Sequence, residues 1–555
     1  MEALRGLWTK MFGDVGTVFA VSIAIIAGFV ATAAVAPEGV ERVARTVLDA
    51  TATRLGWIYL LVTTGFVLFV LFLAISRFGD IRLGAADEPP EFRFASWLAM
   101  IFSAGMGVGL VFWGVAEPMM HFNEPPMDIG TPRTVETAQA GMRYAFFHWG
   151  FHQWANFSVV GLAIAFVRFR HNSRGLISET LRPLFGERVD HGWGKAIDIL
   201  TVVSTVFGVA TTLGLGALQI NSGLATMTSL PYGFSSQFAI IGLLGLMYMG
   251  SAMTPIDKGI RYLSNANMIL AALLLLAVIA FGPTAFIFGV MTQTLGEYLG
   301  HLMEMSLVTS PYGNESWVEQ WTMFYWAWGL SWAPFVGSFI ARISRGRTVR
   351  EFVVGVMIVP VALSMLWFSG FGGSAIYFEL FGGNPGIADA VAREAPAGLF
   401  VLLEQLPWSD GLAVAAIALV CMFVVTSADS ATFVLGMFTS KGLLNPTRFL
   451  RGLWGTLQLL MATVLLLSGG LYGLQTVSII AAFPFMILMI LIAVSLHKDF
   501  AFEIAQENET KRVLQARIEL LLLREAEREE ARQIAEETHP TAPDTDDETT
   551  PQDPA

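Results

Sequence analysis

The sequence predicts an all-α membrane protein that crosses the bilayer many times. Only 14% of its 555 residues are charged, whereas soluble domains carry about 25%. Apolar residues make up 54% of the chain, and they gather in runs that reach the roughly 20 residues a helix needs to cross the bilayer core. A β-barrel would show short alternating segments instead. Composition and run length therefore predict a polytopic helical protein.

The apolar runs predict twelve transmembrane helices. Loops after the even-numbered spans hold eighteen Arg and Lys residues, whereas loops after the odd-numbered spans hold five. Basic loops favour the cytoplasmic side, so both termini are expected in the cytoplasm. The expected spans are about residues 17–36, 56–75, 94–120, 137–167, 196–226, 236–254, 264–290, 317–341, 351–376, 410–438, 449–469 and 472–496.

The first apolar run, Val18 to Val35, ends in small residues that resemble a signal-peptide cleavage site. Its apolar core is longer than the roughly 7–15 residues of a signal peptide. It is therefore predicted to be the first transmembrane helix.

The spans divide the chain into seven segments. Apolar residues at helical spacing between Gln293 and Met305 predict a helix in the outer interface. Beyond His497 the pattern is that of an amphipathic helix, either a solubilising tail or a regulatory element. The segments are a cytoplasmic N-terminus (1–16), two peripheral helices with a loop (17–93), a first five-helix repeat (94–290), the interfacial helix and loop (291–316), a second five-helix repeat (317–496), the cytoplasmic amphipathic helix (497–536) and a disordered acidic tail (537–555).

Two spans are predicted to be broken near the middle of the membrane. The third contains three glycines between Gly105 and Gly109, and the eighth contains the stretch from Trp326 to Pro334. Glycine and proline destabilise helices, and irregular backbone survives in a membrane only where it lines a cavity. These spans are five apart, so each is expected to begin a five-helix unit with the substrate site between the units. The alternative is close helix packing through small residues.

Aromatic residues cluster beside both predicted breaks. On the fourth span Trp154 and Phe157 share a helix face with Trp149 one turn away, and on the eighth Trp328 and Trp332 share a face. Aromatic faces attract quaternary ammonium groups by roughly 0.5–2 kcal/mol each. The pattern therefore predicts an aromatic cage for a cationic or zwitterionic solute.

Two further polar features have alternative interpretations. His148 and His152 are four apart, as metal-ligand pairs are, but hydrogen bonding between helices is favoured because no third ligand follows. The hydroxyls of Thr426 and Ser427 on the tenth span suit either sodium binding or interhelical hydrogen bonds. No nucleophile arrangement typical of an enzyme is recognisable.

The chain resembles the betaine–carnitine–choline transporter family over nearly all of residues 10–500. The most specific stretches are Ala104 to Gly109, Trp149 to Phe157, Gly194 to Leu218 and Phe324 to Arg347. The resemblance implies a LeuT-like fold with two inverted five-helix repeats, alternating access and uptake of trimethylammonium or similar solutes. It also implies homotrimers in a bacterial inner membrane.

The resemblance implies a substrate site on the third, fourth and eighth spans. Phe157 stands where the family has a tyrosine, and Gly329 stands where it has a tryptophan, so one wall of the cage is expected to be missing. Gly109 matches the betaine-type pattern, whereas choline carriers place an aspartate there. The expected substrate-binding residues are Gly105, Met106, Gly107, Gly109, Trp149, Trp154, Phe157, Trp328, Gly329 and Trp332.

The resemblance also implies sodium as the coupling ion. At the second family sodium site Thr205 and Phe335 match, but Val209 replaces a threonine, which puts the second ion in doubt. No Lys or Arg lies between Lys195 and Lys258, where sodium-independent antiporters of the family place a basic side chain. The residues expected at the first sodium site are Ser103, Met106, Phe423, Thr426 and Ser427.

The function expected from these features is sodium-coupled import of glycine betaine or a related osmolyte. A sodium-independent antiporter and a membrane osmosensor with vestigial transport are the alternatives. The expected partners are a small osmolyte and membrane lipids, without nucleic acid.

Overall fold

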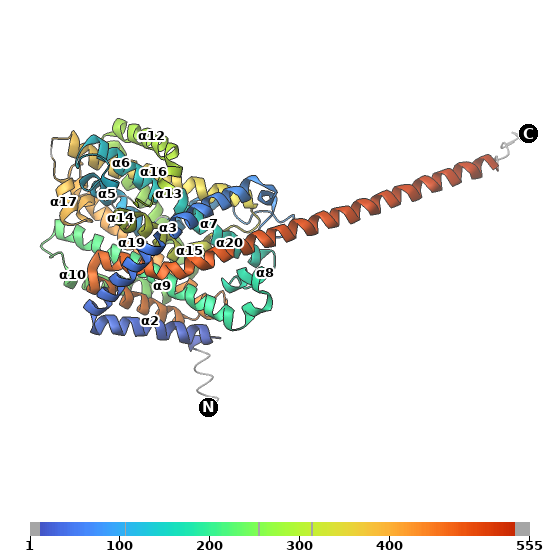
Figure 1. Cartoon of the computed structure of the whole chain (residues 1–555), viewed down its shortest axis with the longest axis horizontal. Helices are drawn as coiled ribbons and strands as arrows, with labels where there is room; N and C mark the ends of the chain where they lie inside the picture. Colours follow the sequence, from blue (N-terminus) through green and yellow to red (C-terminus); the bar gives the residue numbers. More distant parts are fainter. Residues whose placement is uncertain (1–10, 106, 254–255, 312–314, 384, 539–555) are drawn as a thin grey trace, which may run out of the picture. The chain divides into compact units, whose positions relative to one another are not determined.

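The regular structure is helical in the part described by the computed structural model, which covers residues 11–105, 107–253, 256–311, 315–383 and 385–538. Within these ranges no β-strand forms, and one isolated bridge pairs Arg82 with Thr348. The helices (Figure 1) are α2 (Thr17–Val35), α3 (Pro37–Ile75), η1 (Arg77–Asp80), α4 (Phe94–Gly105), α5 (Val108–Asn123), η2 (Pro126–Asp128), α6 (Val135–His148), α7 (Phe151–Phe169), η3 (Ser178–Leu181), α8 (Arg182–Phe185), η4 (Gly186–Asp190), α9 (Gly192–Met227), α10 (Phe234–Met253), α11 (Ile256–Phe281), α12 (Thr284–Gly300), α13 (Leu302–Leu307), α14 (Glu315–Val318), η5 (Glu319–Met323), α15 (Phe324–Ile343), α16 (Val349–Leu380), α17 (Ile387–Arg393), α18 (Ala397–Glu404), α19 (Ser409–Thr439) and α20 (Arg448–Thr538).

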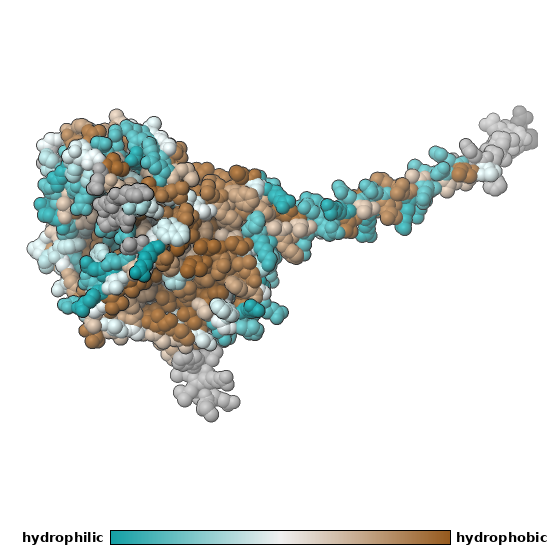
Figure 2. Space-filling model, in the orientation of Figure 1, coloured by the Kyte–Doolittle hydropathy of each residue, from teal (hydrophilic) through white to brown (hydrophobic). Residues whose placement is uncertain are grey.

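The surface of the helical bundle is apolar where it would meet lipid. Large apolar side chains such as Leu68, Leu246, Leu276 and Ile358 are exposed on α3, α10, α11 and α16, and Figure 2 shows apolar side chains spread over a broad zone of the bundle's visible face. Exposed apolar area on this scale needs a partner other than water. The bundle therefore has the surface of a multi-pass membrane protein.

Nine helices in the described ranges are long and apolar enough to cross a membrane. The count differs from the twelve expected spans for local reasons. The third span is divided between α4 and α5, and the eleventh and twelfth both lie within α20. Gly469 and Gly470 interrupt α20 at the expected boundary, where Gly470 takes a φ of 56° that glycine adopts without steric cost. The eighth span, α15, is rich in Trp, Gly and Ser and is almost entirely buried by protein.

Two expected helix positions are wrong. The eighth span was expected to break between Trp326 and Pro334, but α15 continues through Pro334, and the irregular turn is the π-helix η5 before it. A proline is tolerated in such a helix where neighbouring groups satisfy the freed backbone. The seventh span was expected to reach residue 290, but α11 ends at Phe281 because Gly282 and Pro283 interrupt it. The helix expected from Gln293 therefore begins earlier, as α12.

The core is built on α7 and α15, which pack extensively against each other, and on α9 and α19, which form a second closely packed pair. The third-span helix α5 packs against α6, α9 and α16. Each of these three helices also packs against α7 or α15, which carry most of the predicted cage.

The chain divides into two compact units at His497. The described part of the second unit is the C-terminal part of α20, so the helix expected at 497–536 is present. Its apolar side chains, among them Leu514 and Leu521, are exposed. The first ten residues and the acidic tail from residue 539 lie outside the described ranges.

Candidate functional site

The third membrane helix is broken where the glycines predicted a break. Helix α4 ends at Gly105, and α5 begins at Val108 after Gly107, whose backbone is extended (φ −141°, ψ −158°). Met106 lies outside the described residues, as does the side chain of Ser103. A Cβ atom at Gly109 would overlap the Trp328 ring and lie 2.9 Å from the Trp149 ring. Glycine is therefore required here so that two aromatic rings can close over α5.

A second break, which the sequence analysis missed, lies in the fourth span. The span was expected to run unbroken over 137–167, but α6 ends at His148 and α7 begins at Phe151. The Tyr298 hydroxyl accepts the Phe151 N–H at 3.1 Å, which satisfies one of the free donors at the start of α7. A side chain at Gly150 would collide with Tyr298. Because the cap comes from α12, far away in the chain, only tertiary structure shows it.

Seven of the ten predicted substrate-binding residues line one cavity. Of the other three, Gly105 ends α4, Met106 lies outside the described residues and Gly329 is discussed below. The cavity has a volume of about 30 Å³, room for two or three water molecules by the criterion of roughly 10–15 Å³ each. The osmolyte expected from the sequence is larger, so the walls would have to separate to admit it. The lining residues are Gly107, Gly109, Leu110, Trp149, Gln153, Trp154, Phe157, Trp328, Trp332 and Ser364.

The aromatic rings of the cavity pack edge to face. The Trp149 and Trp328 rings are 6.0 Å apart at 87°, Trp154 and Phe157 are 5.5 Å apart at 88°, and Trp328 and Trp332 are 6.1 Å apart at 70°. All five side chains are buried. Rings at such angles can offer faces to a cation from several directions, which is the arrangement that cation–π binding favours.

The side chain of Gln153 fills the space at Gly329, where one wall of the cage was expected to be missing. A Cβ atom at Gly329 would lie 2.6 Å from Cδ and 2.7 Å from Nε2 of Gln153. The Gln153 amide, which also lines the cavity, therefore lies directly against the Gly329 backbone. The wall is thus an amide from α7, where the sequence analysis expected an empty place. The only sequence signal for a role of Gln153 in the cage was its position as a polar residue between Trp149 and Trp154.

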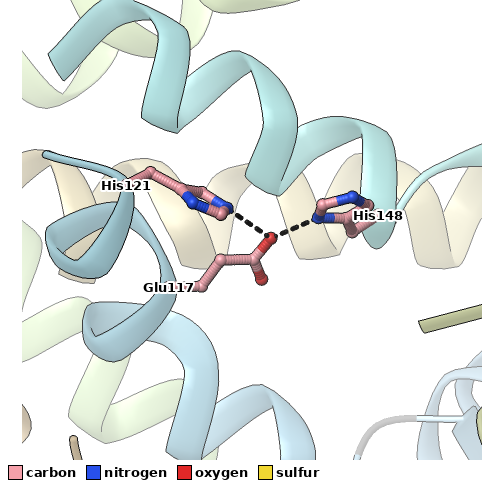
Figure 3. Close-up of side chains that lie close together, drawn as sticks. All are labelled: Glu117, His121 and His148. Carbon is pink, nitrogen blue, oxygen red and sulfur yellow. Dashed lines mark hydrogen bonds and ion pairs between the residues drawn. The ribbon is translucent and has the colours of Figure 1, made fainter. Parts of the chain in front are cut away.

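Trp149 is held by a buried carboxylate that the sequence analysis did not connect with the cage. Oε2 of Glu117 on α5 accepts the Trp149 indole N–H at 2.9 Å and the Tyr325 hydroxyl at 2.6 Å. Oε1 of Glu117 is hydrogen-bonded to Nδ1 of His148 at 2.7 Å, and His121 lies 3.6 Å away (Figure 3). The one available signal in the sequence was an acidic residue within a membrane helix.

His148 and His152 do not form the metal-ligand pair that their spacing of four residues suggested. His152 lies against Oγ of Ser306 at 3.0 Å, whereas His148 faces Glu117, so each bonds to a different helix. Glu117, His121 and His148 offer ligand atoms within 4.8 Å of one another. The two Glu117 oxygens, however, already accept hydrogen bonds. Hydrogen bonding between helices, the favoured interpretation, accounts for His148 and His152.

Three of the five residues predicted for the first sodium site, Phe423, Thr426 and Ser427, lie on α19. Ser103 is on α4, and Met106 lies outside the described residues. Oγ of Ser427 is 3.8 Å from the position of a Cβ at Gly107. The Thr426 hydroxyl donates to the Met422 carbonyl at 2.9 Å and accepts from the Asn267 amide at 3.1 Å. Phe423 is one turn away on the same helix and is buried. Ser427 therefore lies next to the segment that lines the aromatic cavity.

The residues predicted for the second sodium site lie on α9 and α15, which pack together. Thr205 and Val209 are buried one turn apart on α9, and the Thr205 hydroxyl donates to the Thr201 carbonyl at 2.7 Å. Phe335 on α15 contacts the cage ring of Trp332 at 5.6 Å. It also lines a second cavity of about 220 Å³. Phe335 and Trp332 thus connect the walls of two cavities.

The chain is similar to known transporters over most of its length. A family model described as betaine/carnitine/choline family transporter matches residues 17–505. The chain is 44% identical over 497 residues to the glycine betaine transporter OpuD of Bacillus subtilis, covering 89% of this chain and 96% of the relative. It is also 44% identical over 478 residues to an ectoine/hydroxyectoine transporter of Virgibacillus pantothenticus, covering 86% and 95%. Identity to the osmo-dependent choline transporter BetT2 of Acinetobacter baylyi is 37% over 490 residues, covering 88% and 71%.

Proposed function

This chain belongs to the betaine/carnitine/choline family of transporters, and from that premise we propose that it imports a zwitterionic osmolyte together with sodium. The family and the relatives are transporters and not enzymes, and the apolar helices make the chain a multi-pass membrane protein. Glycine betaine and ectoine are the solutes that the names of two relatives at 44% identity carry. Glycine betaine and ectoine are therefore the candidate substrates.

The observation that supports a zwitterion is a cavity with aromatic walls and no charged lining residue within the described ranges. Aromatic faces attract a cationic head group without giving it a counter-charge. A solute that brings its own carboxylate needs no buried acid from the protein. Gly109 has no space for such an acid, because even a Cβ there meets the Trp328 and Trp149 rings. These features favour a zwitterion over a simple cation.

Alternating access is supported by the arrangement of the two cavities. The smaller one is the aromatic cavity, and the larger one is lined by Phe335 together with Arg168 and Arg342, which belong to loops predicted to be cytoplasmic. The contact between the Trp332 and Phe335 rings lies between them. In the proposed cycle this contact opens to release the solute toward the cell interior.

Sodium coupling is supported by the position of Ser427 next to Gly107. An ion held by the α19 hydroxyls would contact the same broken segment that lines the solute cavity, so the two would stabilise one conformation together. One sodium ion crossing about 100 mV gains roughly 2.3 kcal/mol. A tenfold gradient adds about 1.4 kcal/mol, so one ion sustains roughly 500-fold accumulation of a neutral zwitterion.

The direct test is uptake into proteoliposomes of the full-length protein. We expect uptake of labelled glycine betaine or ectoine when sodium is outside, stimulated by an inside-negative potential set with valinomycin and potassium. In a control, potassium buffer without choline replaces the external sodium buffer. Equal solute uptake in the two buffers would overturn the proposed coupling to sodium. Exchange that requires internal solute but no sodium gradient would identify an antiporter instead.

A further inference from the structure

Gln153 and Gly329 form a complementary pair across the interface of α7 and α15. The amide of Gln153 occupies the space that any side chain at Gly329 would need. The amide also lines the aromatic cavity. At this wall the cage therefore offers a hydrogen-bonding group in place of an aromatic face.

Two polar atoms on the walls of this cavity have no partner. Oε1 of Gln153 and Nε1 of Trp328 are both buried without a hydrogen bond to any described residue. Two other indoles that line the cavity are satisfied, since Trp332 donates to the Gly208 carbonyl and Trp149 donates to Glu117. The Trp326 indole on α15 is also unpaired among the described residues, but it does not line this cavity. Buried polar groups in proteins are nearly always hydrogen-bonded. An unpaired acceptor and an unpaired donor on one cavity thus point to a ligand that supplies a donor and an acceptor.

A trimethylammonium group cannot satisfy this wall. Its nitrogen carries only methyl groups, so it has no N–H to donate to Oε1 of Gln153, and the acceptor would stay buried and unpaired. A protonated cyclic amidine has N–H donors and a flat, delocalised charge that suits aromatic faces. If the ring also bears a carboxylate, that group can accept from the Trp328 indole. A site built to hydrogen-bond its substrate discriminates strongly against an analogue that lacks the group.

We infer that Gln153 is a specificity-determining residue that makes the cage select zwitterions with an N–H-bearing cationic group, such as a cyclic amidinium carboxylate, over trimethylammonium zwitterions. The inference rests on the proposed function, in that the aromatic cavity must be the solute site. Gly329 has the supporting role of making room for the amide.

The inference is tested by measuring the affinities of purified full-length protein for ectoine and glycine betaine by tryptophan fluorescence in sodium. We expect wild type to bind ectoine at least about tenfold more tightly, the ratio that about 1.4 kcal/mol gives. Gln153→Leu should abolish this preference by weakening ectoine binding alone. In the double variant Gln153→Ala with Gly329→Trp, an aromatic ring replaces the amide, and the preference should reverse in favour of glycine betaine.

A matched control is Gln219→Leu, because Gln219 is a buried glutamine on α9 whose amide donates to the Pro396 carbonyl and does not line the cavity. The Gln219→Leu variant should prefer ectoine over glycine betaine by the same factor as wild type. Equal affinities in wild type, or equal losses for both solutes in Gln153→Leu, would overturn the inference and leave the proposed function standing. Failure of wild type to bind either solute would instead overturn the proposed function.

Discussion

The indole N–H of Trp149 donates a hydrogen bond of 2.9 Å to the carboxylate of Glu117. The ring of Trp149 lines the aromatic cavity, whereas Glu117 lies behind it among His148 and Tyr325. The carboxylate thus fixes a cage ring that stands at a helix break, where the backbone alone would hold it less firmly. On the proposed function, Glu117 is a positioning residue that acts on a bound solute through Trp149.

Replacing Glu117 with alanine is expected to destabilise the protein and to weaken solute binding. The donors of Trp149 and Tyr325 would stay buried without a partner, at a cost of about 1–3 kcal/mol each. Thermal unfolding and tryptophan fluorescence titration measure the two effects. Tyr325→Phe, which removes one donor and leaves the Trp149 bond, should keep near-normal affinity. Unchanged affinity in folded Glu117→Ala would contradict the positioning role.

Removal of a single cage ring is expected to reduce affinity by a limited factor. Trp154→Ala removes one aromatic face, worth roughly 0.5–2 kcal/mol, which corresponds to about 2-fold to 30-fold weaker binding. Trp193→Ala is the control, because Trp193 is exposed at the start of α9, away from the cavity. An equal loss in both variants, measured by solute titration, would argue that the cavity is not the binding site.

An aspartate at Gly109 is not expected to convert the protein into a choline carrier. The Trp328 and Trp149 rings already occupy the space that a Cβ atom needs, so Gly109→Asp should displace the rings and abolish uptake of every solute. Gly289→Asp serves as the control, because a Cβ there meets nothing within 4 Å. Efficient choline uptake by Gly109→Asp in proteoliposomes would show that the rings yield readily.

The second sodium site is expected to depend on Val209. A hydroxyl is missing where Val209 lies on α9, one turn from Thr205. Val209→Thr should therefore make uptake depend more steeply on sodium, with the Hill coefficient rising from about one toward two, the limit set by the number of sites. Val209→Ala should leave the steepness unchanged. A wild-type coefficient already near two would mean that the valine does not prevent the second ion from binding.

Removal of the second unit is expected to leave sodium-driven uptake intact. Residues from Lys498 onward form a separate compact unit, and the cavity is lined entirely by the first. A variant that ends at His497 should transport at the wild-type rate in iso-osmotic vesicles. Comparison after an osmotic upshift then isolates any regulatory role. Loss of basal transport by this variant, with the protein still folded, would contradict the independence of the two units.

Much of the architecture follows from the sequence because the membrane imposes simple rules. Runs of apolar residues must be helices, since lipid offers no partner for free backbone groups. The break after Gly105 was predictable because three glycines in five residues weaken a helix locally. The cage rings on α7 and α15 were predictable as sets because residues three or four apart share a helix face.

The sequence by itself thus determined the membrane class, the glycine break and the aromatic residues of the cavity. Tertiary structure alone decided what surrounds them: the break at Gly150 capped by Tyr298, the Glu117 carboxylate behind Trp149, and the Gln153 amide against Gly329. Each of these contacts joins residues on different helices, whose relative positions no local pattern encodes. The identity of a cavity wall depends on which side chain reaches it, and that depends on how the helices pack.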